Sequence, residues 1–261
     1  MNLVGIDISL NSTGLSIYRD DEIILSNFTV LKKSYTWIKK TLDYIDYEFI
    51  SYTYPDVTDY SKKEILKLRE FDKVSEIIFN KIFGNIDKTQ QTYIAIEGYN
   101  FGFKQQSNSI VDIVTLSTLI RKKLLDGIPN LQEIFIWSPK TIKSKVCEMT
   151  YGTTTVEKIN KKGIKKITTT INQSPDGITG GKFQKHDIMK AIINLNIDTK
   201  LTNFLNEHSS ELLKMKIIPC PFSDILDSLS ILILMNHHYT KDVVVSGSDP
   251  SFLTFHRQGA S

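Results

Sequence analysis

The feature that most constrains this chain is a short apolar run near its start that ends beside a carboxylate. Residues 3–9 place Asp7 among Leu, Val, Gly and Ile, and turn residues at 11–14 follow at once. This pattern predicts a buried first strand. Because an unpaired ionised carboxylate is costly away from water, Asp7 requires an ion, a partner or an opening to solvent. An Asp that merely begins the turn would explain this run about as often as a functional one.

Acidic residues recur in two similar places further along the chain. Residues 93–97 form another apolar strand pattern that ends on Glu97, and Asp224 and Asp227 stand at i, i+3 in a predicted helix from about 221 to 238. The helix dipole favours acids in the first turns, so capping and solvation are the ordinary explanation for such a pair. The rest of this helix is strongly apolar, which indicates that both acids lie at a buried edge and point at the sheet.

Four carboxylates that converge on one place would repel one another unless cations neutralised them. Oxygen ligands without His or Cys suit Mg²⁺ or Mn²⁺. Two such ions can activate a water and stabilise the leaving oxygen of a phosphodiester. The sequence therefore predicts two Mg²⁺ ions, with Mn²⁺ as a substitute. The residues predicted to be both catalytic and metal-binding are Asp7, Glu97, Asp224 and Asp227.

With these motifs in this order, the chain resembles the RuvC-like branch of the RNase H-like nucleases, which cut four-way DNA junctions. The resemblance spans most of residues 1–240 and rests on four short motifs, at residues 5–14, 94–97, 137–143 and 224–229. It implies an α/β fold with a mixed five-stranded sheet flanked by helices. It also implies a homodimer that acts as a Mg-dependent, structure-selective endonuclease and resolves Holliday junctions by paired symmetric nicks.

The resemblance implies one nuclease domain over residues 1–240, followed by a C-terminal tail over 241–261. Two insertions interrupt it. The one at 32–60 is rich in Tyr and predicts a short helix and then an irregular aromatic segment. The one at 148–184 alternates polar and β-branched residues, which suggests a hairpin that protrudes from the body. These insertions and a composition rich in Ile, Lys and Asn are more typical of a phage or large-virus version than of a bacterial housekeeping enzyme.

Lysines near the predicted acids are candidate DNA contacts. Lys140, Lys143 and Lys145 share one predicted helix, which begins at a Ser-Pro pair. Lys182 and Lys185 belong to a Gly-rich segment that looks like the family's glycine-and-lysine loop, displaced by the second insertion. A solvated lysine face is the alternative explanation for both groups.

The loop after Glu97 is a second candidate DNA contact. It contains Phe101, Phe103 and Lys104 beside two glycines. Phe101 is predicted to stack on or wedge between bases at a junction, with Phe103 as the next candidate. Packing within the loop is the alternative.

Two helices predicted from periodicity carry further expectations. Ser61, with Glu64 three residues on, predicts the cap of a helix that continues to about residue 83. The helix predicted over residues 108–125 is apolar on nearly all faces, so one side can cover the sheet and the other needs another element or a second subunit. This supports the expected homodimer.

Composition excludes several other classes. A net charge of +3 and a hydrophobic content of 41% are ordinary for a soluble globular protein. No run is long and apolar enough to cross a membrane, and the start shows no signal-peptide pattern. Cys147 and Cys220 stand without zinc spacing. We therefore expect a cytoplasmic protein (in the host cytoplasm if viral) that binds branched DNA and no membrane.

Three other functions compete with this interpretation. The actin-like sugar kinases also begin with an Asp on a glycine-containing strand, but they need two such domains and a second glycine-rich nucleotide loop, which this chain lacks. A non-catalytic DNA-binding module on the same fold is disfavoured because all four acids are present. A flap, branch-clearing or packaging nuclease stays open.

Overall fold

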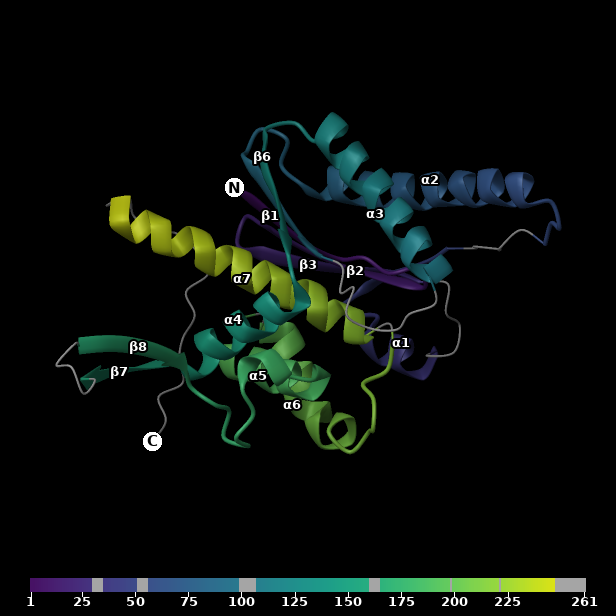
Figure 1. Cartoon of the computed structure of the whole chain (residues 1–261). Helices are drawn as coiled ribbons and strands as arrows, with labels where there is room; N and C mark the ends of the chain where they lie inside the picture. Colours follow the sequence, from purple (N-terminus) through teal and green to yellow (C-terminus); the bar gives the residue numbers. More distant parts are fainter. Residues whose placement is uncertain are drawn as a thin grey trace.

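The computed structural model describes residues 1–29, 35–50, 56–98, 107–159, 165–197, 199–220 and 222–246. Its centre is a mixed six-stranded sheet with helices on both faces (Figure 1). The predicted fold class, a mixed α/β sheet flanked by helices, is confirmed. The predicted number of five strands is wrong by one, because the first insertion contributes a strand of its own.

The sheet has the strand order β4-β3-β2-β1-β5-β6. Strand β1 pairs antiparallel with β2 and parallel with β5, β2 pairs antiparallel with β3, and the outer pairs β3–β4 and β5–β6 are parallel. Because β1 and β5 are parallel neighbours, their carboxyl ends lie at the same edge of the sheet. The strands are β1 (Asn2–Asp7), β2 (Ser12–Arg19), β3 (Glu22–Thr29), β4 (Asp46–Phe49), β5 (Thr92–Glu97) and β6 (Leu131–Trp137).

The additional strand β4 lies where the sequence predicted an irregular aromatic segment. It is four residues long, two of them acidic, and it pairs with the second half of β3. Short charged strands are typical of sheet edges, which explains why no apolar alternation marked it. The hydroxyl of Tyr47 in β4 forms a 2.6 Å hydrogen bond with the hydroxyl of Thr41, at the end of helix α1 (Tyr35–Thr41). The aromatic side chain thus fixes the new strand to the preceding helix.

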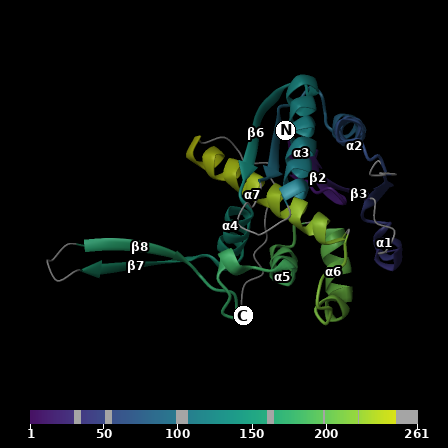
Figure 2. The same ribbon diagram turned by 45° about the vertical axis from the view of Figure 1, so that its right-hand side comes forward.

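Helices lie in two layers, one on each side of the sheet (Figure 1, Figure 2). Helices α2 and α3 cover one face, while α7 crosses the other, with α4, α5 and α6 beyond it. A two-stranded hairpin, β7–β8, projects from the α4 side. The bounds are α1 (Tyr35–Thr41), α2 (Tyr60–Asn85), α3 (Ser107–Gly127), α4 (Pro139–Tyr151), β7 (Thr153–Ile159), β8 (Lys165–Ile171), the 3-10 turn η1 (Gly180–Lys182), α5 (Lys185–Leu195), α6 (Thr199–Leu212) and α7 (Phe222–Ser246).

Two helix ends differ from the predictions. Helix α2 is capped by Asp59, whose carboxylate accepts a 2.8 Å hydrogen bond from the Lys62 backbone N–H, and Ser61 is already inside the helix. Asp is as good an N-cap as Ser, and it stands where the chain is still extended. Helix α7 continues to Ser246, into the segment assigned to the tail.

The face beneath α2 and α3 is mainly apolar, and its buried polar side chains include Ser26 of β3 and the Lys67–Asp112 ion pair between the two helices. Alternate residues of the central strands, such as Val4 and Ile6, point to this side and pack against Ile78 of α2 and Ile120 of α3, all of them buried. Helix α3 is not covered all round, since Val111 and Leu125 are 59% and 63% exposed. No helix in the described parts of the chain combines the length and the hydropathy that a membrane span requires.

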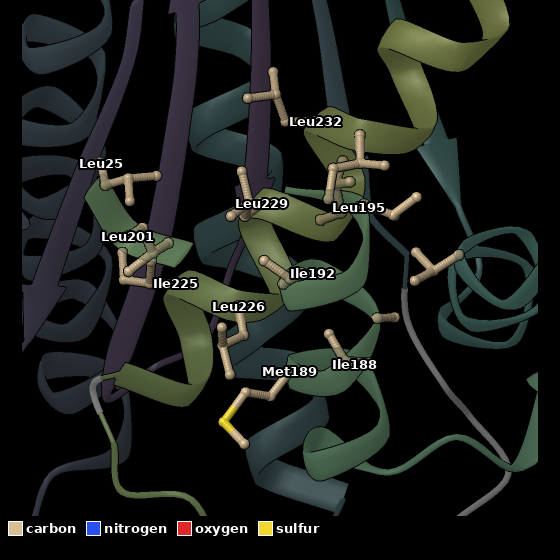
Figure 3. Close-up of a cluster of buried hydrophobic side chains, with 14 of the residues drawn as sticks. Leu25, Ile188, Met189, Ile192, Leu195, Leu201, Ile225, Leu226, Leu229 and Leu232 are labelled. Atoms are coloured by element: carbon tan, nitrogen blue, oxygen red, sulfur yellow. The ribbon is translucent and has the colours of Figure 1, made fainter. Parts of the chain in front are cut away.

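The opposite face is covered mainly by α7. The helix buries Leu226 and Leu229 against α5, where Met189 and Ile192 meet them (Figure 3). Towards the sheet, however, α7 makes its closest contacts with backbone instead of side chains. That close approach positions the acids described next.

Candidate active site

Glycines in β1 and β2 bring the start of α7 directly onto the sheet. A Cβ on Gly14 would lie 2.1 Å from the backbone oxygen of Asp224, and one on Gly5 would lie 2.5 Å from that of Ser228. Ser16, the neighbour of Gly5 across the strands, bonds to Ser228 through their hydroxyls at 2.8 Å. No larger side chain fits beneath the helix along this path. We call Gly5, Gly14 and Ser16 the small-residue track.

This track places the α7 acids beside the end of β1. Gly14, which lies under Asp224, is also the register partner of Asp7, the last residue of β1. Asp7 and Glu97 end adjacent parallel strands, and their predecessors Ile6 and Ile96 are paired. One carboxylate oxygen each of Asp7, Glu97 and Asp227 lies within 4.8 Å of the others. The sheet edge and the helix therefore bring together three of the four predicted acids.

The fourth acid, Asp224, lies one helical turn before Asp227. Its Oδ1 accepts a hydrogen bond of 3.2 Å from the Ser223 hydroxyl. Its Oδ2 is buried and has no hydrogen-bond partner among the described residues. A buried carboxylate oxygen without a donor is costly unless a cation lies nearby. Asp224 stands outside the group of three, but its charge acts on two of its members.

Burial and mutual repulsion disfavour ionisation of these acids. Burial raises the pKa of Asp7 well above its ordinary value, and Glu97 raises it further; Lys185 opposes this and Asp224 adds to it. Burial also raises the pKa of Glu97, against the opposing charges of Lys185 and Lys143. The pKa of Asp224 is raised by burial and lowered in part by the Ser12 hydroxyl and by Lys185. Neutral or cation-bound forms of the site are therefore favoured.

Lys185 lies among the acids. It is the first residue of α5, and its ammonium pairs with Asp227 and donates to the backbone oxygen of Ser223 at 3.3 Å. The start of α5 is fixed by a capping box, in which Gln184 and Asp187 exchange hydrogen bonds between side chain and backbone. The sequence predicted Lys185 as a DNA contact, and the structure adds its ion pair with a predicted metal ligand.

The other predicted lysines flank the acids at different depths. Lys143 of α4 is half-buried and close enough to Glu97 to act on its pKa. Lys140 and Lys182 are exposed. Lys145 pairs with Glu148 on its own helix at 2.6 Å. Gly180 lies against α4, where an added Cβ would be 2.7 Å from that of Cys147, so the lysine loop is held on the helix.

The aromatic loop lies beyond what the structure describes. Phe101, Phe103 and Lys104 fall within residues 99–106, outside the described residues, so their predicted DNA contacts stay predictions.

Three neighbours of the acids had not been singled out from the sequence. The hydroxyls of Ser12 and Ser223 favour the ionised form of Asp224. Cys220 is close enough to the acids for their charges to act on its pKa, and its Sγ lies 3.2 Å from the Ser223 Oγ. Burial raises the pKa of Cys220, which keeps its thiol protonated. Their positions in the sequence could have indicated the two serines as neighbours of the acids, because Ser12 opens the hairpin turn after Asp7 and Ser223 immediately precedes Asp224.

No protein-family model and no curated protein matches the sequence. Solved structures do. Thermus thermophilus RuvC in complex with a Holliday junction substrate is similar over 93% of this chain and 96% of that chain, at 11% identity and a TM-score of 0.44. A second Thermus thermophilus RuvC structure covers the same shares at 12% identity and a TM-score of 0.43.

The yeast mitochondrial Holliday junction resolvase Ydc2 is similar over 92% of this chain and 83% of that chain, at 11% identity and a TM-score of 0.44. Function has to be argued from the site itself.

Proposed function

We propose that this protein is a metal-dependent endonuclease that resolves four-way DNA junctions by paired, symmetric nicks. One observation carries the proposal: oxygens of Asp7, Glu97 and Asp227 lie within 4.8 Å of one another, with the unpartnered Oδ2 of Asp224 on the same helix as Asp227. Ionised carboxylates at such distances require compensating cations. A site that only maintained the fold would gain nothing from gathering them.

The donor atoms fit a hard divalent cation. The gathered ligand atoms are carboxylate oxygens, which suit Mg²⁺ and, as a substitute, Mn²⁺. Asp7, Glu97, Asp224 and Asp227 would hold two such ions. Bound there, the ions would supply an activated water and stabilise the charge that develops on a phosphodiester.

The basic residues around the acids supply the electrostatics for a polyanionic substrate. Lys185 and Lys143 offset the carboxylates, and both are available to a phosphate once a cation neutralises the acids. Lys140 and Lys182 extend this positive charge outward from the site. Ammonium groups arranged in this way bind the DNA backbone without reading its sequence. Lys145 contributes less, because Glu148 neutralises it.

A branched substrate is part of the proposal because the family that the sequence motifs resemble cuts four-way DNA junctions. Paired symmetric cuts need two copies of the site, so we include a homodimer in the proposal. The exposed Val111 and Leu125 of α3 are the apolar positions available for it. Phe101 would hold the crossover open in each subunit, with Phe103 and Lys104 beside it.

The deciding experiment is cleavage of a synthetic four-way junction with Mg²⁺, next to a flap and a linear duplex of the same sequence. The proposal expects paired nicks at symmetric positions in the junction and none in the duplex. Preferential cutting of the flap would instead establish a flap, branch-clearing or packaging nuclease. Tight junction binding without cleavage in Mg²⁺ or Mn²⁺ would establish a non-catalytic DNA-binding module.

A further inference from the structure

The hairpin β7–β8 is a ribbon that stands clear of the body in both views (Figure 1, Figure 2). Its strands pair from Thr153–Ile171 at the root to Ile159–Lys165. Consecutive residues at the start of β7 are all exposed, so both faces of the ribbon meet solvent there. On β8, Ile167 is 70% exposed. A two-stranded ribbon without a covering layer is only marginally stable alone, so an element of this kind indicates a binding role.

The ribbon is anchored firmly at its root. The Asn172 side-chain amide donates to the backbone oxygen of Tyr151 at 2.9 Å. The Asn172 backbone N–H donates to the backbone oxygen of Gly152 at 3.0 Å. Its own backbone oxygen accepts from the Cys147 thiol, and its side-chain oxygen accepts from the Thr154 hydroxyl. The bonds tie the ribbon to the last turn of α4, which sets its direction.

Helix α4 connects the ribbon to the acidic site. Its first half carries Lys143, which acts on Glu97, and its last turn holds the ribbon root. In Figure 1 the ribbon lies beyond α4, on the side away from α2 and α3. Thirteen helical residues span about 20 Å and seven strand residues about 23 Å. Placed end to end, the two elements would span about 43 Å, or about 12 base pairs of duplex, which is an upper limit on the reach from the start of α4 to the far end of the strands.

The composition of the two strands fits a phosphate backbone. They contain six Thr and three Lys against a single Glu. That Glu157 is paired with Lys165 at 2.8 Å, and the backbone register pairs position 158 with position 166, both of which are Lys in the sequence. Hydroxyl and ammonium donors are common phosphate ligands, and a two-stranded ribbon fits the major groove of DNA.

We propose that the β7–β8 ribbon is a second DNA-binding site, which holds a duplex arm of the substrate up to about 12 base pairs from the cleavage site through contacts to phosphates. The ligand is duplex DNA of any sequence. A protein partner fits less well, since described strand positions offer only Val156 and Ile167 as exposed large apolar residues and no aromatic anchor. The identity of the duplex as an arm of branched DNA rests on the proposed function.

The test compares two triple variants in an Asp7→Asn background, which removes a predicted metal ligand so that binding is measured without cutting. The ribbon variant is Lys158→Gln, Lys165→Gln, Lys166→Gln. The matched control, Lys62→Gln, Lys63→Gln, Lys73→Gln on α2, removes the same charge, and Lys73 is paired with Glu70 as Lys165 is with Glu157. Dissociation constants are measured for four-way junctions with 8-base-pair and 20-base-pair arms over a series of salt concentrations.

The ribbon variant should bind the long-armed junction about tenfold more weakly, and its log–log salt slope should fall by about 2–3. Its affinity for short arms should change less than twofold, and the control should match the parent on both substrates. Equal losses on short and long arms, no loss, or the same loss in the control would overturn the proposal. A second variant, in which residues 154–170 are replaced by an Asn-Gly turn, should reproduce the long-arm loss while its melting temperature stays near that of the parent.

These readouts separate the two proposals. If the unmutated protein cuts no branched DNA, but the ribbon still adds affinity for long duplexes, the nuclease assignment fails and the second site stands. If junctions are cut and the ribbon variant binds long arms normally, the nuclease stands and the second site fails.

Discussion

The two faces of the central strands are built from alternate residues of the same segments, yet they do opposite things. In β1, Val4 and Ile6 enter the apolar layer under α2 and α3, whereas Gly5 and Asp7 lie beneath α7. The first face is filled by large side chains. The second offers glycine and a carboxylate, and the helix above it rests on the strand backbone.

The difference separates the face whose packing stabilises the fold from the face whose buried acids reduce that stability. Burial of aliphatic side chains under α2 and α3 stabilises the sheet, and the Lys67 and Asp112 side chains buried between these helices form an ion pair at 2.7 Å. On the α7 face, burial raises the pKa of three carboxyl groups and leaves an Asp224 oxygen without a hydrogen-bond donor. The apolar face thus offsets the energetic cost of the acidic one. Changes on each face should therefore have separable effects.

The largest effect is expected from Asp7→Asn. Removing a ligand charge without adding bulk should lower Mg²⁺-dependent junction cleavage by about a thousandfold or more, in line with several kcal/mol of metal-dependent stabilisation. Junction binding should stay near that of the unmutated protein. Parallel gel-shift and cleavage assays check this, with Asp126→Asn as a control on the exposed end of α3. Near-normal nicking by Asp7→Asn would contradict the site assignment. Glu97→Gln, Asp224→Asn and Asp227→Asn should behave alike.

A pair of substitutions, one on each face, tests the comparison directly. Ile78→Ala leaves a cavity under α2 and should reduce the free energy of unfolding by about 2–5 kcal/mol. Gly14→Ala places a methyl group against the Asp224 backbone and should reduce it by about 1–3 kcal/mol.

The two variants should differ in metal binding. Gly14→Ala moves the start of α7, so its Mn²⁺ affinity should fall, while the affinity of folded Ile78→Ala should be unchanged. Urea unfolding and calorimetric Mn²⁺ titration at 15 °C measure both quantities. If Gly14→Ala binds Mn²⁺ normally, the small-residue track does not position the acids.

The outer surface of α3 provides a test of the dimer. Val111 and Leu125 are exposed and lie on nearly the same side of the helix, since 14 residues make about four turns. Val111→Glu with Leu125→Glu should convert a dimer into a monomer at micromolar concentration, as measured by light scattering. Leu213→Glu with Ile217→Glu, two exposed apolar positions near the end of α6 and on the opposite side of the sheet from α3, serve as the matched charge control. An unmutated protein that is monomeric and still cuts junctions in pairs would refute this interface.

The acidic face should also control stability as a function of pH in the metal-free protein. Because the pKa of Asp7, Glu97 and Asp224 is raised by folding, the folded state binds more protons than the unfolded state above about pH 4. Stability from these groups is therefore lost as pH rises through the raised values.

Asp7→Asn removes one such group, so its melting temperature in EDTA at pH 8 should exceed that of the unmutated protein, by about 2–4 °C for each kcal/mol relieved. Thermal unfolding from pH 4 to pH 8 measures the effect. A lower melting temperature at pH 8 would mean that Asp7 is a structural residue.

The smallest effect concerns Lys185. Its ammonium and a metal ion compete for Asp227, so Lys185→Met should tighten Mn²⁺ binding without DNA by about three- to tenfold. Lys182→Met removes the same charge from an exposed position three residues earlier and should leave the affinity nearly unchanged. Calorimetric titration at pH 8 distinguishes them. Weaker binding by Lys185→Met would show that the lysine organises the acids instead of competing for them.

The positions of the acids along the chain were readable from sequence because each breaks a strong local pattern. Asp7 and Glu97 end apolar strands, and Asp224 and Asp227 interrupt an apolar helix. The structure places three of them in contact range and the fourth beside them. Their role as metal ligands stays a prediction.

Features that depend on contacts between residues far apart in the chain could not be predicted from the sequence. Gly5 and Gly14 are compatible with turns, bulges or close packing, and only the α7 backbone above them decides which applies. Strand β4 shows no alternation of apolar and polar residues, because it is an edge strand that is held by its pairing with β3. The α2 cap shifted to Asp59 because Ser61 and Asp59 are both suitable residues within one turn.

The small-residue track also determines when the acids can come together during synthesis of the chain. The track lies within the first 16 residues of the chain, and the helix that rests on it begins at Phe222. During synthesis the track is made about 200 residues before the helix that packs on it. Until then Asp7 has neither Asp224 nor Asp227 beside it. A chain that ends before residue 222 therefore carries no assembled acidic cluster, so under the proposed function it would be unable to cut DNA.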